Sequence, residues 1–317
     1  MAVAESRSWG LRIAGEEVEA SSGEHFDVYA PADGSLVGKA ARAVAADVDR
    51  AVKAARAAFD GWSQTPPGER ERILLRAAEL VDEHAEQLRE LLIDESGSAV
   101  TKAGYEISKG AQLLRVAAGE ARRLYGDTFP NDRNHRLSIV LREPVGVVAA
   151  ISPFNAPLAL FAKMTVFAVA AGNTVVAKPS EETPLIALAY ARILDEAGLP
   201  PGVVNVVTGF GKDCGDPLVR HDDIQAIAFT GSTNVGRAIG AVAADHLKRV
   251  QLELGGKNPL IILADYDPEE AASQAVVGSF SHGGQICMSS SRILVERPLM
   301  DAFCAAFKRR CEGLKLG

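Results

Sequence analysis

The chain has 317 residues, of which 47% are hydrophobic and 24% charged, a composition typical of soluble globular proteins. That length predicts two domains, each large enough to bury a core of its own. The formal net charge is -7 and no run of Lys or Arg forms a basic stripe, which argues against nucleic acid as a partner.

The cysteines and the apolar segments exclude further classes of protein. None of the four cysteines forms a C-x-x-C pair or has a histidine at ligand spacing, so no metal site is expected. The most apolar region, residues 157–177, is interrupted by Lys163, Gly172 and Asn173, and divides into a helix, a turn and a strand rather than a membrane span. The N-terminal segment lacks the basic start and apolar run of a secretory signal, so we expect a cytoplasmic protein without disulfides.

The first part of the chain predicts short strands and turns through about residue 45, followed by three helices. Apolar spacing places these helices at residues 45–62, 66–97 and 100–126, and the second begins with Pro and ends with Gly, as helices commonly do. A polar stretch then leads to strands within residues 137–153. No internal repeat is visible.

From Val145 onward, short apolar strands alternate with helices. The predicted strands cover residues 145–152, 173–180, 202–209, 224–232 and 249–256. This alternation predicts an α/β fold with a doubly wound, Rossmann-like parallel sheet covered by helices on both faces. Ligands of such sheets bind beyond the carboxyl ends of the strands, so the residues that follow each strand are the candidates for a site.

Polar or glycine-rich residues follow every one of these strands. They are Asn155 after the first, Lys178, Ser180 and Glu181 after the second, Gly209, Gly211 and Gly215 after the third, Gly231, Ser232 and Gly236 after the fourth, and Glu253 after the fifth. The clearest local signal is FTGSTNVGR, because Gly231 can turn the chain and Ser232 can cap a helix whose N-terminus would bind phosphate. Plain capping stays open, since the segment matches neither a Walker loop nor G-x-G-x-x-G.

Each of the other polar residues has a structural and a functional interpretation. Lys178 and Glu181 could form a solvated ion pair, or Glu181 could accept hydrogen bonds from ribose hydroxyls and repel a 2′-phosphate, which favours NAD over NADP. Asn155 could cap a helix or donate to a developing oxyanion. Glu253 could simply end a strand, or its carboxylate could activate water if a narrow, partly dry site raised its pKa.

Cys287 lies in the stretch SHGGQICMSSSR, between two glycines and a run of serines. A buried structural thiol is one interpretation and a nucleophile is the other. Because an ordinary thiol is only about 3% thiolate at pH 7, a nucleophile needs help from a helix start or a group of backbone N–H donors.

Five segments occur in an order that resembles the aldehyde dehydrogenase superfamily: ISPFNAP, VVAKPSEETP, FTGSTNVG, ELGGKNP and GGQICMSSSR. The spacing of 34 positions between Glu253 and Cys287 adds to the resemblance, which covers essentially the whole chain. The segments PFNAP and GQICMSS resemble those of the branch that contains vanillin, benzaldehyde and salicylaldehyde dehydrogenases.

The resemblance implies that Cys287 is the nucleophile and Glu253 the general base, while Asn155 and the backbone N–H of Cys287 form the oxyanion hole. The implied reaction oxidises an aldehyde, an aromatic one in this branch, to the carboxylic acid with NAD, through a thiohemiacetal and a thioester. The cofactor would contact residues at the strand ends, namely Ser152, Pro153, Phe154, Lys178, Ser180, Glu181, Gly211, Gly231, Ser232, Gly236 and Leu254.

The resemblance also implies an NAD-binding domain over residues 1–252, with a bridging segment near 126–144, and a partial catalytic domain over 253–317. Because family members continue well beyond Cys287, we expect a C-terminally truncated chain whose full-length form is a homo-oligomer. The main alternative is a catalytically inactive remnant that retains nucleotide or subunit binding. A thiol hydrolase is a lesser alternative, and a coenzyme A-dependent acylating enzyme is disfavoured because Glu253 would activate water.

Overall fold

The computed structural model describes residues 8–315. The chain divides into two compact units, residues 1–253 and 254–317. The boundary follows the last strand of the main sheet, next to the glycine pair of the ELGGKNP segment.

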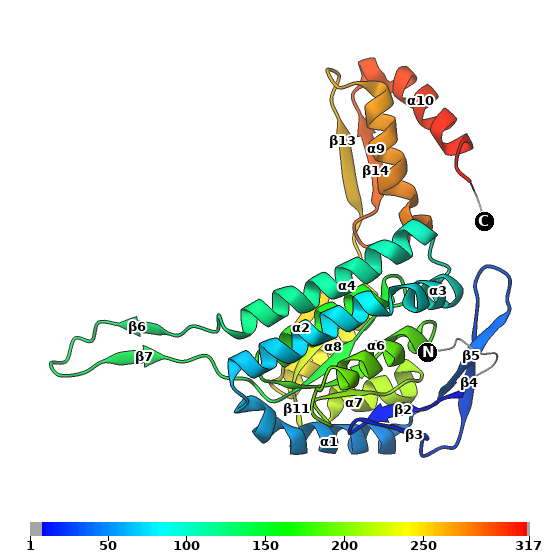
Figure 1. The fold of residues 1–317 in the computed structure, drawn as a ribbon. Coiled ribbons are helices and arrows are strands. Elements are labelled where there is room, and N and C mark those ends of the chain that lie inside the picture. The colour runs from blue at the N-terminus through cyan, green and yellow to red at the C-terminus, as the bar shows by residue number, and fades with distance from the viewer. Residues whose placement is uncertain (1–7, 316–317) are drawn as a thin grey trace. The chain divides into compact units, whose positions relative to one another are not determined.

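A seven-stranded sheet with the order β12-β11-β8-β9-β10-β2-β3 forms the centre of the first unit (Figure 1). Its strands are β2 (Leu11–Ile13), β3 (Glu16–Val18), β8 (Val147–Ile151), β9 (Thr174–Lys178), β10 (Val204–Val206), β11 (Ile224–Thr230) and β12 (Arg249–Glu253). The strands from β8 to β12 run parallel, which confirms the predicted α/β sheet. The N-terminal strands β2 and β3 extend it as an antiparallel edge.

Helices cover both faces of this sheet. Helices α5 (Pro157–Ala170) and α6 (Pro184–Glu196) pack on one face, and α1 (Ala45–Ser63) and the short α7 (Asp216–Arg220) lie on the other. Helix α8 (Thr233–Asp245) packs on β11 and β12. Strands β8 and β9 are buried on both faces, which explains why their sequences are continuous apolar runs instead of alternating ones.

The helical region before the sheet forms an outer layer over α5 and α6. It contains α2 (Pro67–Glu83), α3 (Ala85–Ser96) and α4 (Val100–Ala121). The prediction of one helix over residues 66–97 is wrong, because the chain departs from helical geometry at His84 and starts a second helix. The break carries no Gly or Pro, and it lets both halves bury leucines in one core, Leu80 before it and Leu88 after it. Tertiary packing therefore decides this boundary.

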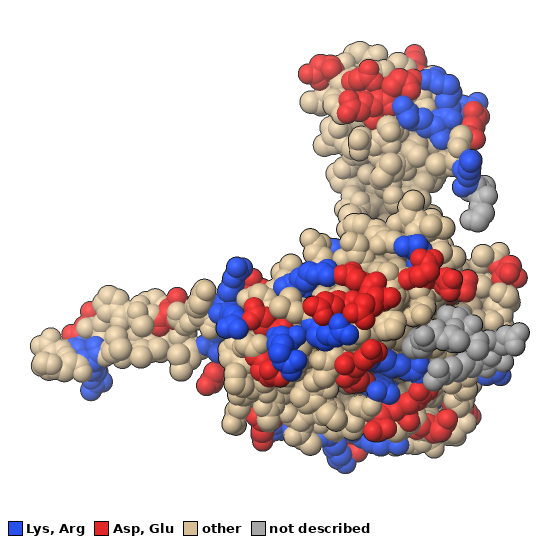
Figure 2. All heavy atoms as spheres, viewed as in Figure 1, with Lys and Arg blue, Asp and Glu red and all other residues tan. Residues whose placement is uncertain are grey.

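Two small sheets complete the first unit. Strands β1 (Ser8–Trp9), β5 (Leu36–Ala41) and β4 (His25–Tyr29) form a three-stranded sheet near the start of the chain. Strands β6 (Asp127–Phe129) and β7 (Ser138–Val140) form an antiparallel hairpin that projects from the rest of the unit (Figure 1). Figure 2 shows charges of both signs interspersed over the face that carries α2 and α4, whereas the hairpin is mostly uncharged.

The second unit is a small α/β assembly. Its parallel strands β13 (Asn258–Ile262) and β14 (Ser290–Val295) are joined through α9 (Pro268–Phe280), and α10 (Met300–Glu312) follows. The two helices contribute Ala272, Ala275, Phe303 and Ala306 to its core. The elements of this unit therefore follow in the order strand, helix, cysteine turn, strand and helix. Among residues 8–315, no helix is both long enough and apolar enough to cross a bilayer.

Candidate nucleotide-binding and active-site residues

A cavity of about 770 Å³ opens at the carboxyl ends of strands β8 to β11, within the first unit. The predicted cofactor residues that line it are Ser152, Pro153, Phe154, Lys178, Ser180, Glu181, Gly211, Gly231 and Ser232. Four loops that are distant in sequence thus meet around one space, as the parallel sheet requires. The other two candidates, Gly236 and Leu254, do not line this cavity.

The N-terminus of α8 forms one wall of the cavity. Ser232 caps this helix, because its Oγ accepts a hydrogen bond from the backbone N–H of Val235 at 3.4 Å. Ser232 therefore caps α8, and the N-terminus of the same helix also borders the cavity. A Cβ at Gly231 would lie 2.5 Å from the ring of Phe229, so any larger residue in the turn before the helix would displace that ring. Gly236 is buried in the first turn of α8.

Lys178 and Glu181 lie on the wall formed by the loop after β9. The Lys178 side chain is buried, and its Nζ donates to the carbonyl of Pro179 at 2.8 Å and lies 3.4 Å from a carboxylate oxygen of Glu181. The Glu181 side chain is 38% exposed, so its second oxygen can accept from a ligand. The solvated ion pair considered from the sequence is wrong for Lys178, whose charge lies out of water.

Several cavity residues were missed by the sequence analysis. They come from the segment after β10 and from α7 and α8, and they are Lys212, Asp216, Val219, Arg220, Asn234, Val235, Ala238, Ile239 and Val242. The signal was present in α8, where Val235, Ala238 and Val242 recur at helical spacing. The sequence analysis did not single out that stripe.

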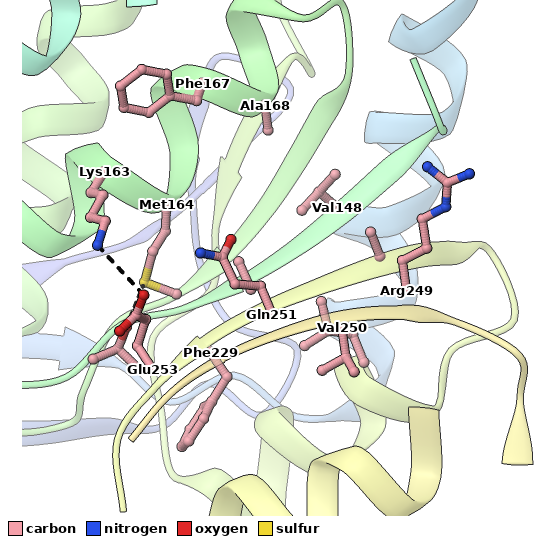
Figure 3. A pocket seen from close by; sticks show the side chains of 14 residues that line it. Val148, Lys163, Met164, Phe167, Ala168, Phe229, Arg249, Val250, Gln251 and Glu253 are labelled. Carbon is pink, nitrogen blue, oxygen red and sulfur yellow. Dashed lines mark hydrogen bonds and ion pairs between the residues drawn. The ribbon is translucent and has the colours of Figure 1, made fainter. Parts of the chain in front are cut away.

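Glu253 ends β12 beside the glycine turn. Its backbone carbonyl accepts a hydrogen bond from the N–H of Gly231 at 3.1 Å, which ties the two strand ends together. Its carboxylate lies 3.7 Å from the Nζ of Lys163 on α5 (Figure 3). The Glu253 side chain is 53% exposed, in contrast to the partly dry site considered from the sequence. Lys163 was seen only as an interruption of an apolar segment.

A second cavity of about 440 Å³ borders Glu253 and Lys163. Figure 3 shows Met164 and Phe167 of α5 and Phe229 of β11 around it, together with Arg249 at some distance from the carboxylate along β12. The side chains from α5 and from the strand faces are largely apolar. The space beside Glu253 therefore offers an apolar surface with one ion pair at its edge.

Asn155 does not cap α5, so that interpretation of the sequence is wrong. The residue at the cap position is Ala156, which offers no side-chain hydrogen bond. The first N–H groups of α5 instead donate to the carboxylate of Glu106 on α4, from Leu158 at 3.2 Å and from Ala159 at 3.3 Å. The backbone carbonyl of Asn155 accepts a hydrogen bond from Lys102, also on α4, at 2.7 Å.

Cys287 lies exposed in a tight turn of the second unit. Ser289 N–H donates to the Ile286 carbonyl across this turn at 2.9 Å. The side-chain amide of Asn258 donates to the carbonyls of Cys287 and Ser289, at 2.6 and 3.1 Å. No helix begins at Cys287, so the helix start considered from the sequence is absent from this turn. Asn258, which holds the turn, was quoted within ELGGKNP but not recognised.

The remaining cysteines do not share this environment. Cys214 is buried close to Lys178, and burial raises the pKa of its thiol to about 11, as expected of a structural cysteine. All four cysteines are free thiols. Within residues 8–315, no three His, Cys, Asp or Glu side chains are grouped so as to hold a metal ion.

The family model described as "Aldehyde dehydrogenase family" matches residues 18–317. This chain belongs to the aldehyde dehydrogenase family. Phenylacetaldehyde dehydrogenase from Pseudomonas fluorescens is 45% identical over 300 residues, which cover 92% of this chain and 60% of that protein. The chain thus spans less than two thirds of the length of that relative.

Solved structures of other family members are similar in fold. The structure of PnpE in complex with nicotinamide adenine dinucleotide has a TM-score of 0.95 and 40% identity, covering 97% of this chain and 63% of PnpE. A salicylaldehyde dehydrogenase from Pseudomonas putida G7, complexed with salicylaldehyde, has a TM-score of 0.95 and 37% identity, covering 98% of this chain and 65% of that one. These similarities agree with the predicted Rossmann-like architecture.

Proposed function

We propose that this chain belongs to an enzyme that oxidises an aldehyde to the carboxylic acid with NAD, in two steps that pass through a thioester. The observation that carries the proposal is the cavity at the strand ends, around which four separate sequence segments meet. The relatives named for phenylacetaldehyde and salicylaldehyde support an aromatic aldehyde as the substrate. The apolar surface beside Glu253, which includes Met164 and Phe167, is suited to such a ring.

The residues around the cavity are suited to NAD. The N-terminus of α8, capped by Ser232, would hold the pyrophosphate, and Glu181 with Lys178 would hold the adenosine ribose. The exposed carboxylate oxygen of Glu181 would accept from both ribose hydroxyls and would repel the 2′-phosphate of NADP. When bound, NAD supplies the hydride acceptor of the reaction.

The nucleophile in this proposal is Cys287. Its thiolate adds to the carbonyl carbon, forming a C–S bond and placing the negative charge on the former carbonyl oxygen. The side-chain amide of Asn155 and the backbone N–H of Cys287 would donate to that oxygen. When the hydride leaves, the C=O bond forms again and the product is a thioester on Cys287. The exposure of Cys287 supports this role, because an aldehyde can reach the sulfur.

Glu253 is the proposed base of the second step. Its carboxylate takes a proton from water, the resulting hydroxide adds to the thioester carbon, and the C–S bond breaks to release the acid and the Cys287 thiolate. The overall change consumes one aldehyde, one NAD and one water. The position of Glu253 at the edge of the second cavity supports this role, because an aldehyde bound against that apolar surface would lie beside the carboxylate.

Three broader parts of the proposal concern organisation. Residues 1–252 would bind NAD and residues 253–317 would be part of a catalytic domain, a division that the two compact units support. A homo-oligomer is supported by the apolar side chains exposed on the β6–β7 hairpin, which include Phe129 and Ile139. A cytoplasmic location is supported by the four free thiols.

A second candidate function is nucleotide binding without turnover. The cavity is formed entirely by residues of the first unit, so binding of NAD there does not depend on Cys287. This observation favours nucleotide binding without turnover as the alternative to an enzyme.

One experiment separates the two functions. The chain is titrated with NAD by calorimetry, and NADH absorbance is then followed with phenylacetaldehyde, salicylaldehyde and aliphatic aldehydes. The proposal expects binding and NADH formation, with Cys287→Ala abolishing the second and sparing the first. Glu253→Gln should release one equivalent of NADH and then stall at the thioester. Binding without NADH formation across the panel would support the remnant, and turnover by Cys287→Ala would reject the nucleophile.

A further inference from the structure

Two charged side chains of α4 lie against the loop that carries Asn155. Glu106 is 1% exposed and the Lys102 side chain is 13% exposed, and the two form an ion pair one helical turn apart. Burying such a pair is costly unless further hydrogen bonds satisfy both groups. In this case the additional partners are found in the loop between β8 and α5.

Lys102 contacts the loop at Asn155, the residue before Ala156. Its Nζ donates to the carbonyl of Asn155 at 2.7 Å and to the hydroxyl of the buried Ser98 at 2.9 Å. Together with Glu106, these partners account for the three N–H donors of the ammonium group. The ammonium therefore holds the Asn155 peptide group in a fixed direction.

Glu106 contacts the chain after Ala156, at the start of α5. One carboxylate oxygen pairs with Lys102, and the other accepts the N–H groups of Leu158 and Ala159 at the start of α5. This carboxylate replaces the side-chain cap that Ala156 lacks. Burial raises the pKa of Glu106 and lowers that of Lys102, which reflects how far both charges lie from water.

We propose that the Lys102–Glu106 pair is the positioning device for Asn155, fixing the backbone on both sides of Ala156 so that the Asn155 amide points at the reacting oxygen. The inference rests on the proposed function, in which that amide donates to the oxyanion. Such a donor acts only when it is preorganised, because the free energy of reorienting it would otherwise oppose the reaction. Lys102 and Glu106 touch neither substrate nor cofactor in this scheme and act through Asn155.

The chain contains a matched control in Glu95 on α3. Glu95 is 2% exposed and accepts the N–H groups of Leu185 and Ile186, at 2.5 and 2.9 Å, at the start of α6. It is the same kind of buried carboxylate cap, but on the next helix of the sheet. Removing it weakens a helix start without touching the Asn155 loop.

Hydrogen exchange of the backbone amides tests the geometric half of the inference on the full chain. Lys102→Met should speed exchange at residues 155–160 by about tenfold, the loss expected for one charged hydrogen bond, and leave residues 185–187 unchanged. Glu95→Gln should do the reverse. Unchanged exchange at 155–160, or an equal rise at both helix starts, would overturn the proposal. Should Lys102→Met not fold, Glu106→Gln tests the same amides, because it keeps an acceptor for α5 and loses the charge.

A double-mutant cycle tests the functional half. Lys102→Met should slow the first-turnover formation of NADH by about tenfold and leave the Kd for NAD unchanged. In an Asn155→Ala background the same change should have less than about a twofold effect, because the group it positions is gone. Additive losses would assign Lys102 a purely structural role and overturn the inference.

The exchange and kinetic experiments also distinguish failure of this inference from failure of the proposed function. Turnover by Cys287→Ala would reject the proposed chemistry, whatever the exchange pattern. If the wild-type chain binds NAD but forms no NADH, the exchange comparison alone decides whether Lys102 and Glu106 fix the Asn155 loop.

Discussion

Lys163 on α5 and Glu253 at the end of β12 form an ion pair with 3.7 Å between Nζ and the nearer carboxylate oxygen. The side chains are 48% and 53% exposed, so water and salt screen the pair. We expect Lys163→Met to lower the free energy of unfolding by less than about 1 kcal/mol. Urea unfolding at low and high salt measures this, and a loss above about 2 kcal/mol would contradict the exposed geometry.

The buried carboxylate of Glu95 predicts a pH dependence of stability. Burial raises its pKa from 4.5 to about 8 in the folded state, while the unfolded chain keeps the ordinary value. Between these values the folded state holds a proton that the unfolded state has released, so the free energy of unfolding falls as the pH rises from about 4.5 to about 8 and levels off above that.

Glu95→Gln removes this titration and provides the comparison. Urea unfolding of both proteins across that pH range should show the wild-type chain losing stability relative to Glu95→Gln, mainly toward neutral pH. Parallel profiles for the two proteins would show that the carboxyl does not carry the raised pKa.

The four thiols should differ in their reactivity toward iodoacetamide. Cys287 and Cys304 are exposed and Cys311 is partly exposed, whereas Cys214 is buried and its pKa is raised to about 11. Mass spectrometry of the native chain should therefore find the first three alkylated and Cys214 protected. In urea, Cys214 should react as well. Native labelling of Cys214 would mean that the packing of the loop after β10 opens readily.

Glu181 should control the choice between NAD and NADP. Glu181→Gln removes a carboxylate that would face the 2′-phosphate. At about 4 Å one such repulsion is worth roughly 1 kcal/mol in bulk water and roughly 4 kcal/mol near a protein surface, so we expect a change of at least about fivefold. Calorimetry should show the ratio of the Kd for NADP to that for NAD falling by this factor. Glu182→Gln is the control, because Glu182 is exposed and does not line the cavity. Equal effects of the two changes would reject a specific role for Glu181.

The parallel sheet and its ligand edge were predictable because their signals are local. Buried parallel strands such as β9 are short apolar runs, and the polar residues after them must gather at one edge of the sheet. The contacts of Lys102 with Asn155 and of Lys163 with Glu253 join residues 53 and 90 positions apart. The spacing of apolar residues along the sequence does not indicate such pairs. The break at His84 is likewise decided by packing, since the sequence there would continue a helix.

Helix caps are likewise only partly predictable from the sequence. A Ser before a helix signals its own cap, as Ser232 does for α8. The helices α5 and α6 begin after Ala156 and Thr183, and neither residue caps its helix through its side chain. Their caps come from Glu106 and Glu95 on other helices, which a sequence shows only as glutamates within amphipathic helices.

The β6–β7 hairpin provides the last prediction. Its strands and their flanks expose Phe129, Leu137, Ile139 and Leu141, with Ile139 56% exposed. Apolar side chains gathered on a projecting two-stranded hairpin are expected to be covered by another protein surface, because an isolated hairpin is marginally stable in water. If the proposed homo-oligomer uses this surface, analytical ultracentrifugation of the chain should detect association that Ile139→Asp weakens.

A matched substitution separates a specific interface from general apolar contact. Val116 on α4 is 46% exposed and lies outside the hairpin, so Val116→Asp should leave the association unchanged. Neither change removes a buried side chain, and both should alter the free energy of unfolding of the monomer by less than about 1 kcal/mol. Equal weakening by the two substitutions would argue against the hairpin, because a subunit contact built on β6 and β7 has to lose more from a charge placed within it than from one on α4.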